Sequence, residues 1–298
     1  MDKVSTEEVN AVTTNIGLTE QSNTCSKPCK PSSEESKDGL FVRGSDSGPE
    51  ASCLPVDLLR DGARELGVEL GDAQIELLQQ FASLLVETNK TLNLTRITDP
   101  TEIVTGHYLD SFTCLAAGKV KRNARVIDIG TGAGFPGVPI KIARPGLGMT
   151  LLDSSAKKLK FIENAIAAMN ASAAAGEPPL EVEFVHARAE EAGRDPAHRE
   201  AYDVVLARAL ADMKVLAELC LPLVKVGGTL IAQKSEGADD EIDSARALIG
   251  QLGGRVERIA RIKIPYTEIT RRLVVISKIK PTGPEFPRPF SKISRTGK

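Results

Sequence analysis

The sequence predicts an α/β fold in which a mostly parallel sheet carries helices on both faces. From Arg125 to about Lys280, short apolar runs alternate with helical stretches. Such alternation builds a doubly wound parallel sheet, because each helix returns the chain to the start of the next strand. The first apolar run also passes directly into a glycine-rich turn, which is typical of a ligand-binding loop at the carboxyl end of a strand.

Composition and charge limit the classes of function. The chain has 298 residues, of which 41% are hydrophobic, and it contains no Trp, so its core must be largely aliphatic. No apolar run approaches the ~20 residues of a membrane-spanning helix, and no apolar signal segment follows Met1. We therefore expect a cytoplasmic protein without membrane contacts. The net charge of −2 does not by itself suggest a nucleic-acid partner.

The first segment, residues 1–53, is rich in Ser, Thr, Glu and Lys and poor in apolar residues. It cannot bury enough apolar surface to offset the lost chain entropy, so we expect a disordered extension. Cys25 and Cys29 lie close together, but no second cysteine pair accompanies them. Because the common zinc sites need such a second pair of ligands, we expect no metal.

Residues 54–120 are predicted to form a helical cap. Apolar residues recur at helical spacing from Ile75 to Leu85, after Asp72, which is a candidate N-cap. A loop follows this helix, and a second helix is expected over residues 101–117. Both helices lead into the core of the protein.

The core, residues 121–280, supplies the sheet. We expect strands at Arg125–Ile129, Met149–Asp153, Leu180–Val185, Asp203–Ala207, Thr229–Gln233, Arg255–Ile264 and Arg272–Ser277. Helices are expected from Pro136 and over Ala156–Met169, Asp212–Leu223 and Asp239–Leu252, with an inserted loop at 171–179. The last two strands have no helix between them and should pair antiparallel. Residues 281–298 contain four prolines and mostly basic charges, which predicts an extended tail.

The strongest local signal is the strand and glycine turn VIDIGTGAG at residues 126–134. Glycines are needed where a ligand approaches the backbone closely or where a turn requires a positive φ. Residues 132–137 also match G-x-G-x-x-G, the dinucleotide fingerprint, and Asp153 follows at the distance expected for a ribose contact. A phosphate-binding P-loop is excluded because no Gly-Lys-Ser/Thr follows. The turn alone leaves both a dinucleotide and a methyl donor open.

Asp128 favours the methyl donor. A carboxylate just before the turn would repel a pyrophosphate, which binds at a bare helix N-terminus. S-adenosylmethionine carries a sulfonium and an ammonium group and no phosphate, so a nearby carboxylate helps to bind it. Asp153 ends the second strand and is placed to accept hydrogen bonds from the ribose hydroxyls. The alternative is that Asp153 caps the helix that Ser154 and Ser155 open.

Several segments match one family in the same order along the chain. They are NLT at 93–95, HYLDS at 107–111, DIGTGAGFPG at 128–137, LLDS at 151–154, ARA at 207–209 and RLVVI at 272–276. From about Asp72 to Lys280 the chain resembles the bacterial 16S ribosomal RNA guanine-N7 methyltransferases, also called glucose-inhibited division protein B. So many segments in one order are far more specific than a glycine turn alone.

The resemblance implies a class I S-adenosylmethionine methyltransferase fold, Rossmann-like, with seven strands and a small helical N-terminal cap. It also implies methyl transfer to N7 of one guanine in the decoding-region hairpin of 16S RNA, so the partner is this RNA or the small ribosomal subunit. Besides Asp128 and Asp153, the residues it places around the donor are Gly130, Gly132, Phe135, Ala189, Glu190 and Arg208.

Guanine N7 carries a free lone pair at neutral pH, so we expect no general base, and His107 and Arg208 are candidates for positioning. His107 is equally a candidate for a buried, hydrogen-bonded core histidine. Arg208 could instead form a salt bridge to Asp203 or Asp212. Cys220 lies on an apolar helix face and is expected in the core, not as a nucleophile.

Contacts to RNA phosphates are expected from basic residues near the end of the chain. These are Arg271, Arg272, Arg288 and Lys292. We expect the protein to act as a monomer. Two other functions stay open at this point: an NAD(P)-dependent oxidoreductase that uses the same glycine turn, and a non-catalytic RNA-binding factor that retains the methyltransferase fold.

Overall fold

The structure is a computed structural model that describes residues 54–173, 178–208 and 211–295. The predicted N-terminal extension, with Cys25 and Cys29, lies outside these residues. Within the described ranges, no helix is both long enough and apolar enough to cross a membrane.

A seven-stranded sheet forms the centre of the fold, in the order β3-β2-β1-β4-β5-β7-β6. The strands are β1 Arg125–Ile129, β2 Gly148–Asp153, β3 Val182–His186, β4 Tyr202–Arg208, β5 Val224–Ser235, β6 Gly254–Lys263 and β7 Thr270–Lys278. The first five run parallel, and β7 is antiparallel to both of its neighbours, β5 and β6. This sheet confirms the predicted doubly wound, mostly parallel α/β fold with seven strands, and it confirms the antiparallel pairing of the last two strands.

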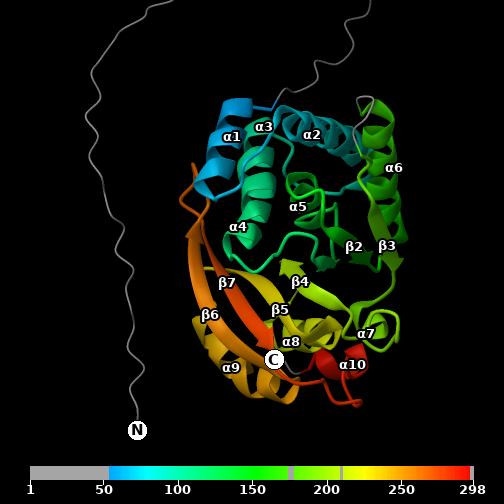
Figure 1. Ribbon diagram of the computed structural model, residues 1–298, viewed down its shortest axis with the longest axis vertical. Helices are drawn as coiled ribbons and strands as arrows, with labels where there is room; N and C mark the ends of the chain where they lie inside the picture. The colour runs from blue at the N-terminus through cyan, green and yellow to red at the C-terminus, as the bar shows by residue number, and fades with distance from the viewer. Residues whose placement is uncertain (1–53, 174–177, 209–210, 296–298) are drawn as a thin grey trace, which may run out of the picture. The chain divides into compact units, whose positions relative to one another are not determined.

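Helices cover both faces of this sheet (Figure 1). They are α1 Val56–Glu65, α2 Asp72–Leu92, α3 Pro100–Glu102, η1 Ile103–Leu109, α4 Asp110–Ala116, α5 Gly137–Ala143, α6 Ala156–Ser172, α7 Ala189–Ala192, α8 Met213–Cys220, η2 Leu221–Leu223, α9 Asp239–Gln251 and α10 Phe290–Ile293. The helices α1 to α6 share one hydrophobic core with the sheet, and α7 to α10 share the other.

The central strands are buried on both sides, because successive side chains of a strand point to opposite faces. In β1, Val126 belongs to the core with α2 and α5, whereas Ile127 and Ile129 belong to the core with α8 and α9. This two-sided burial explains the continuous apolar runs in the sequence. Cys220 on α8 is fully buried in the second core, which confirms its predicted place.

The cap helices pack on the same core as the helices that follow the glycine turn. Phe81 of α2 meets the ring of Phe135 edge-on, with 5.7 Å between the centroids. The N-cap prediction is wrong by one residue, because Gly71 is the N-cap and Asp72 is the first helical residue. The amide of Gly71 is satisfied by Oε1 of Gln74 at 2.7 Å, so the cap needs no side chain of its own.

The C-terminal segment, residues 281–295, packs on the second helical layer and is not the extended tail that its prolines predict. Arg199 donates hydrogen bonds to the carbonyl oxygens of Thr282 at 2.8 Å and Phe286 at 2.9 Å. Ile293 in α10 is fully buried. The segment has little regular secondary structure, but side chains of the core satisfy its backbone.

Candidate active site

The glycine turn joins β1 to α5 at the carboxyl edge of the parallel strands. Gly130 and Gly132 have φ angles of 69° and 60°, which glycine adopts without strain. The amides of Gly130 and Thr131 both donate to the carbonyl oxygen of Leu152, at 2.8 and 3.0 Å. The turn is therefore tied to the end of β2, and its shape is fixed before any ligand binds.

Asp128 lies beneath this turn and is fully buried. Its Oδ2 accepts a hydrogen bond of 2.9 Å from the amide of Gly137, the first residue of α5. That amide is therefore bound to the protein's own carboxylate, whereas a dinucleotide fold offers it to a pyrophosphate. Burial raises the pKa of Asp128 to about 6, while the Thr131 hydroxyl, the Gly137 amide and Arg208 oppose the rise. Asp128 therefore stabilises the junction between the glycine turn and α5.

Asp153 connects the turn to the next helix. Its Oδ2 accepts from the amide of Gly132 at 2.9 Å, and its Oδ1 accepts from the amide of Ser155 at 2.8 Å. Ser155 and not Asp153 is the N-cap of α6, so the predicted alternative is wrong, although Oδ1 of Asp153 binds the amide of that cap residue. The other oxygen stabilises the glycine turn, and the carboxyl group lies at the edge of a cavity.

This cavity, the turn pocket, has a volume of about 340 Å³ and lies at the carboxyl ends of β1 and β2. It brings together four of the residues predicted to bind the methyl donor: Gly130, Asp153, Ala189 and Glu190. The lining of this pocket suits such a donor. Gly130 has no side chain to obstruct the strand end, and the carboxylates of Asp153 and Glu190 can accept hydrogen bonds from hydroxyl and amino groups. Arg188, Ala211 and Phe290 also line the turn pocket.

A second cavity of about 520 Å³ lies beside η1 and α4, at the ends of β4, β5 and β7. Three cationic side chains line it, and we call it the basic pocket; they are Arg208, Lys234 and Arg271. His107 and Asp110 also line it. Ala211 lines both cavities, so the turn pocket and the basic pocket adjoin there.

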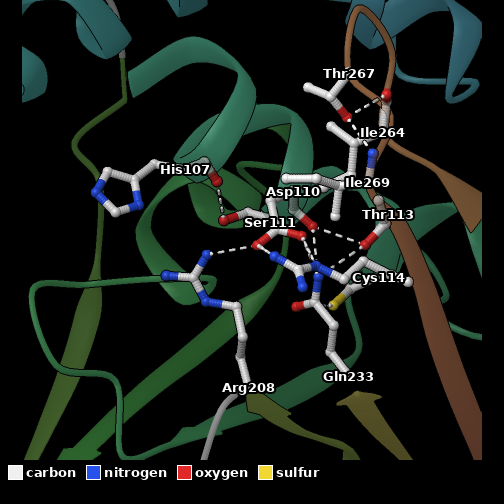
Figure 2. Close-up of polar contacts among 11 residues, drawn as sticks. His107, Asp110, Ser111, Thr113, Cys114, Arg208, Gln233, Ile264, Thr267 and Ile269 are labelled. Carbon is white, nitrogen blue, oxygen red and sulfur yellow. Dashed lines mark hydrogen bonds and ion pairs between the residues drawn. The ribbon is translucent and has the colours of Figure 1, made fainter. Parts of the chain in front are cut away.

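Asp110 organises the basic pocket, as Figure 2 shows for the side chains that converge on it. Arg271 donates to both carboxylate oxygens, at 2.7 and 3.2 Å, and Arg208 donates to Oδ2 at 3.1 Å. Gln233 donates to Oδ1 at 2.5 Å. Because Asp110 is buried, removing one partner would leave charge poorly compensated, so this network holds both guanidinium groups in place.

His107 lies on η1, a π-helical turn that continues directly into α4. Such turns occur frequently at functional sites. The ring stacks on Phe135 with 4.1 Å between centroids, and its Nε2 is 2.9 Å from Oγ1 of Thr95. Its Nδ1 has no hydrogen-bond partner within the described part of the chain. Burial, with Arg208 nearby, lowers the pKa of His107 to about 4, so the imidazole is neutral at physiological pH.

The remaining predicted residues lie in different places. Gly132 belongs to the turn, while Phe135 is buried between the turn and His107. The RNA prediction is wrong for Arg272, which is buried and donates to Asp239 at 2.6 Å. The guanidinium of Arg288, another predicted RNA contact, donates hydrogen bonds to the buried carboxylate of Glu218. Of the four predicted RNA contacts, Arg271 lines the basic pocket, and Lys292 on α10 stays a prediction.

The sequence interpretation missed Asp110 and Gln233 as members of the site. A salt bridge was considered for Arg208, but its partner is Asp110 and neither Asp203 nor Asp212. Asp203 binds β1 and a lysine of β5, and Asp212 caps α8. A signal for Asp110 was present, because it belongs to the HYLDS segment that carries the family resemblance.

A family model described as rRNA small subunit methyltransferase G matches residues 74–271. The chain is 42% identical over 239 residues to ribosomal RNA small subunit methyltransferase G of Alkaliphilus oremlandii, covering 80% of this chain and 97% of that protein. It is 45% identical over 231 residues to the protein of the same name from Symbiobacterium thermophilum, covering 78% and 93%. The solved structure of TrmN from Thermus thermophilus aligns with a TM-score of 0.42 at 16% identity, over 59% of this chain and 53% of that one.

The family match spans the glycine turn, Asp153 and every member of the Asp110 network. The relatives are matched along nearly their whole length. This chain belongs to the rRNA small subunit methyltransferase G family.

Proposed function

We propose that this protein transfers the methyl group of S-adenosylmethionine to N7 of a guanine in 16S ribosomal RNA. The fold and the family make it an S-adenosylmethionine-dependent methyltransferase. The choice of guanine N7 is supported by one observation above all. The imidazole of His107, which lines the basic pocket beside the turn pocket, is neutral and a weak proton acceptor, and methylation at N7 needs no proton acceptor.

The turn pocket is where the donor would bind. When bound, S-adenosylmethionine supplies an electrophilic methyl group on a positively charged sulfur. Asp153 would accept hydrogen bonds from the ribose hydroxyls, and Ala189 and Glu190 would flank the adenine. Asp128, below the turn, would add negative charge beneath the cationic end of the donor, since electrostatic attraction acts strongly in a buried site.

Guanine N7 attacks through its lone pair, so no proton has to be removed. N7 forms a bond to the methyl carbon, the bond from that carbon to sulfur breaks with its electron pair remaining on sulfur, and the positive charge passes to the guanine ring. The protein's task is to hold N7 in line with the methyl group, an effect worth several kcal/mol. His107 is suited to positioning, because its ring is fixed by stacking on Phe135 and by the contact of its Nε2 with Thr95.

The cations of the basic pocket would contact the RNA backbone. Arg208 and Arg271 are held by Asp110 and face the cavity, where phosphate oxygens can bind their remaining N–H groups. Fixed guanidinium groups lose little side-chain entropy on binding. RNA recognition would thus depend on a local cluster, which agrees with a chain whose net charge is only −2.

Single-turnover methyl transfer tests this function. Labelled S-adenosylmethionine and small ribosomal subunits from cells lacking the enzyme are mixed with excess protein. The rate should be nearly flat between about pH 6.5 and 8.5, because no general base titrates. His107→Ala should lower the rate and leave that profile flat. A rate that rises steeply with pH, and loses this rise in one variant, would show that the target atom must give up a proton and is not N7. Absence of transfer would leave only an RNA-binding factor.

A further inference from the structure

One wall of the turn pocket comes from a part of the chain far from the glycine turn. Phe290, the first residue of α10, lines this cavity together with Asp153 and Glu190. It lies in the C-terminal segment, beyond the span that the family model matches. None of the donor-binding residues expected from the sequence lies in this segment, so the contribution of Phe290 has to be explained from the structure.

The C-terminal segment holds Phe290 at fixed points on both sides. Two residues before it, the amide and the guanidinium of Arg288 donate to Glu218 at 2.9, 2.8 and 2.5 Å. Glu218 is 0% exposed on α8, so Arg288 is needed to compensate its buried charge. Three residues after Phe290, Ile293 is fully buried in the second core. The position of the intervening ring is therefore set before a ligand binds.

The ring of Phe290 is partly covered by a neighbouring side chain. The guanidinium of Arg188 lies 4.7 Å from the ring centroid, and its Nε donates to Glu190 at 2.6 Å. Phe290 nevertheless remains 39% exposed, an unusual state for a fixed phenylalanine. A planar, apolar ligand group placed against this ring would bury that surface and gain stacking.

The ends of the turn pocket can be told apart by their chemistry. Asp153, at the end of β2, offers a carboxylate to the ribose hydroxyls of the donor. Glu190 and Arg188 lie just after β3, where the adenine is expected, and Phe290 lies against Arg188. We propose that Phe290 packs on the adenine of the methyl donor and contributes directly to donor binding. This inference depends on the donor site and not on which RNA atom is methylated.

Binding of S-adenosylhomocysteine, measured by calorimetry, tests the proposal in the full chain. Phe290→Ala should weaken binding about tenfold, as expected from loss of base–aromatic stacking, and Phe290→Tyr should retain most of the affinity. Leu92→Ala is the matched control, because Leu92 is also 39% exposed and lines a different cavity. Phe290→Ala that melts like the original protein and binds with unchanged affinity would overturn the proposal.

A fluorescence experiment locates the contact on the ligand. The chain contains no Trp, so Phe290→Trp introduces a single reporter at this position. Its emission should change saturably with S-adenosylhomocysteine and with adenosine, which both carry adenine, and should not change with methionine. Leu92→Trp should respond to none of them. A response to methionine alone, or no response to either adenine compound, would contradict the assignment even if Phe290→Ala failed to fold.

Discussion

Two buried residues of the site, His107 and Asp128, affect stability in opposite directions as the pH falls. The pKa of His107 is lowered from 6.5 to about 4, so between these values the unfolded chain binds a proton that the folded chain does not, and stability decreases. The pKa of Asp128 is raised from 3.8 to about 6, so the folded chain binds its proton first and stability increases. The two contributions oppose each other over nearly the same range.

Asp128→Asn should separate these contributions. The variant lacks the carboxyl group whose protonation stabilises the folded chain, so its stability relative to the original protein should rise with pH from about 4 to 6. The slope should approach about 1.4 kcal/mol per pH unit, the value for one proton. Urea unfolding across this range measures it, with Asp243→Asn, an exposed carboxylate, as the control. A difference independent of pH would mean that Asp128 titrates with its ordinary pKa.

Asp153→Ala should weaken S-adenosylmethionine binding by roughly 1.5–3 kcal/mol, the range for hydrogen bonds to a charged acceptor. Part of the loss should come from the glycine turn, because the amide of Gly132 loses its acceptor. Asp243→Ala, on the surface of α9, should bind the donor normally. Calorimetry gives the affinities, and equal binding by both variants would remove Asp153 from the site.

The residues that line the turn pocket could be singled out one by one in the sequence, but the Asp110 network could not. Gly130 follows one strand that is visible in the sequence and Asp153 ends the next, and parallel strands bring their carboxyl ends together. Asp110 is separated from Arg208, Gln233 and Arg271 by 98, 123 and 161 positions. No periodicity relates such residues, so only the folded chain shows that they meet.

The helix expected over residues 101–117 contains a π-helical turn that the sequence does not predict. Seven residues, Ile103–Leu109, adopt π-helical geometry between two α-helical turns. This places His107 against Phe135 and Asp110 below the arginines. The π-helical stretch is too short to leave a periodicity of its own in the sequence, so sequence analysis predicts the helix and not the π turn.

The start of α5 offers a test of how tightly the glycine turn is packed. A Cβ at Gly137 would lie 2.3 Å from Cδ2 of Leu151 and 2.9 Å from Oδ2 of Asp128. Gly137→Ala should therefore lower the free energy of unfolding by about 1–3 kcal/mol, the usual cost of overpacking. The matched control is Gly250→Ala on α9, where no atom lies within 4 Å. It should stabilise the protein by about 0.4–1 kcal/mol, because alanine restricts the unfolded chain.

Urea unfolding of both glycine variants gives the comparison. Equal stabilities for Gly137→Ala and Gly250→Ala would show that the turn can move to accommodate a methyl group, and would contradict a rigid donor site.

The C-terminal segment is an element whose packing the sequence did not predict. Its prolines suppress helical and strand patterns, while its partners, such as Arg199, lie about 80 positions away, so composition alone predicted a tail.

For the whole molecule, the alternation of strands and helices was enough to predict the doubly wound sheet, although not its complete order. The insertion of β7 between β5 and β6 is a long-range feature that alternation does not specify. Strand ends were also less certain: β5 begins at Val224, five residues before the prediction, because Gly227 and Gly228 interrupt its apolar run. These differences lie away from the glycine turn, so they did not affect the donor prediction.

The whole fold brings the two pockets together at the carboxyl edge of the sheet. The turn pocket uses β1, β2 and the C-terminal segment, while the basic pocket uses η1, β4, β5 and β7. Ala211 lines both pockets. The proposed reaction has one chemical outcome, a methyl group on a guanine nitrogen that needs no deprotonation.

Identifying the methylated atom tests this claim most directly. Small ribosomal subunits from cells lacking the enzyme are incubated with the protein and S-adenosylmethionine, and the 16S RNA is then reduced and treated with aniline, which cleaves at 7-methylguanosine. We expect cleavage at a single guanine, matched by one methylated guanosine in the nucleoside mass spectrum, and less of both with Asp153→Ala at the same donor concentration. Incorporation of the methyl group without aniline cleavage, or in a nucleoside other than guanosine, would contradict it.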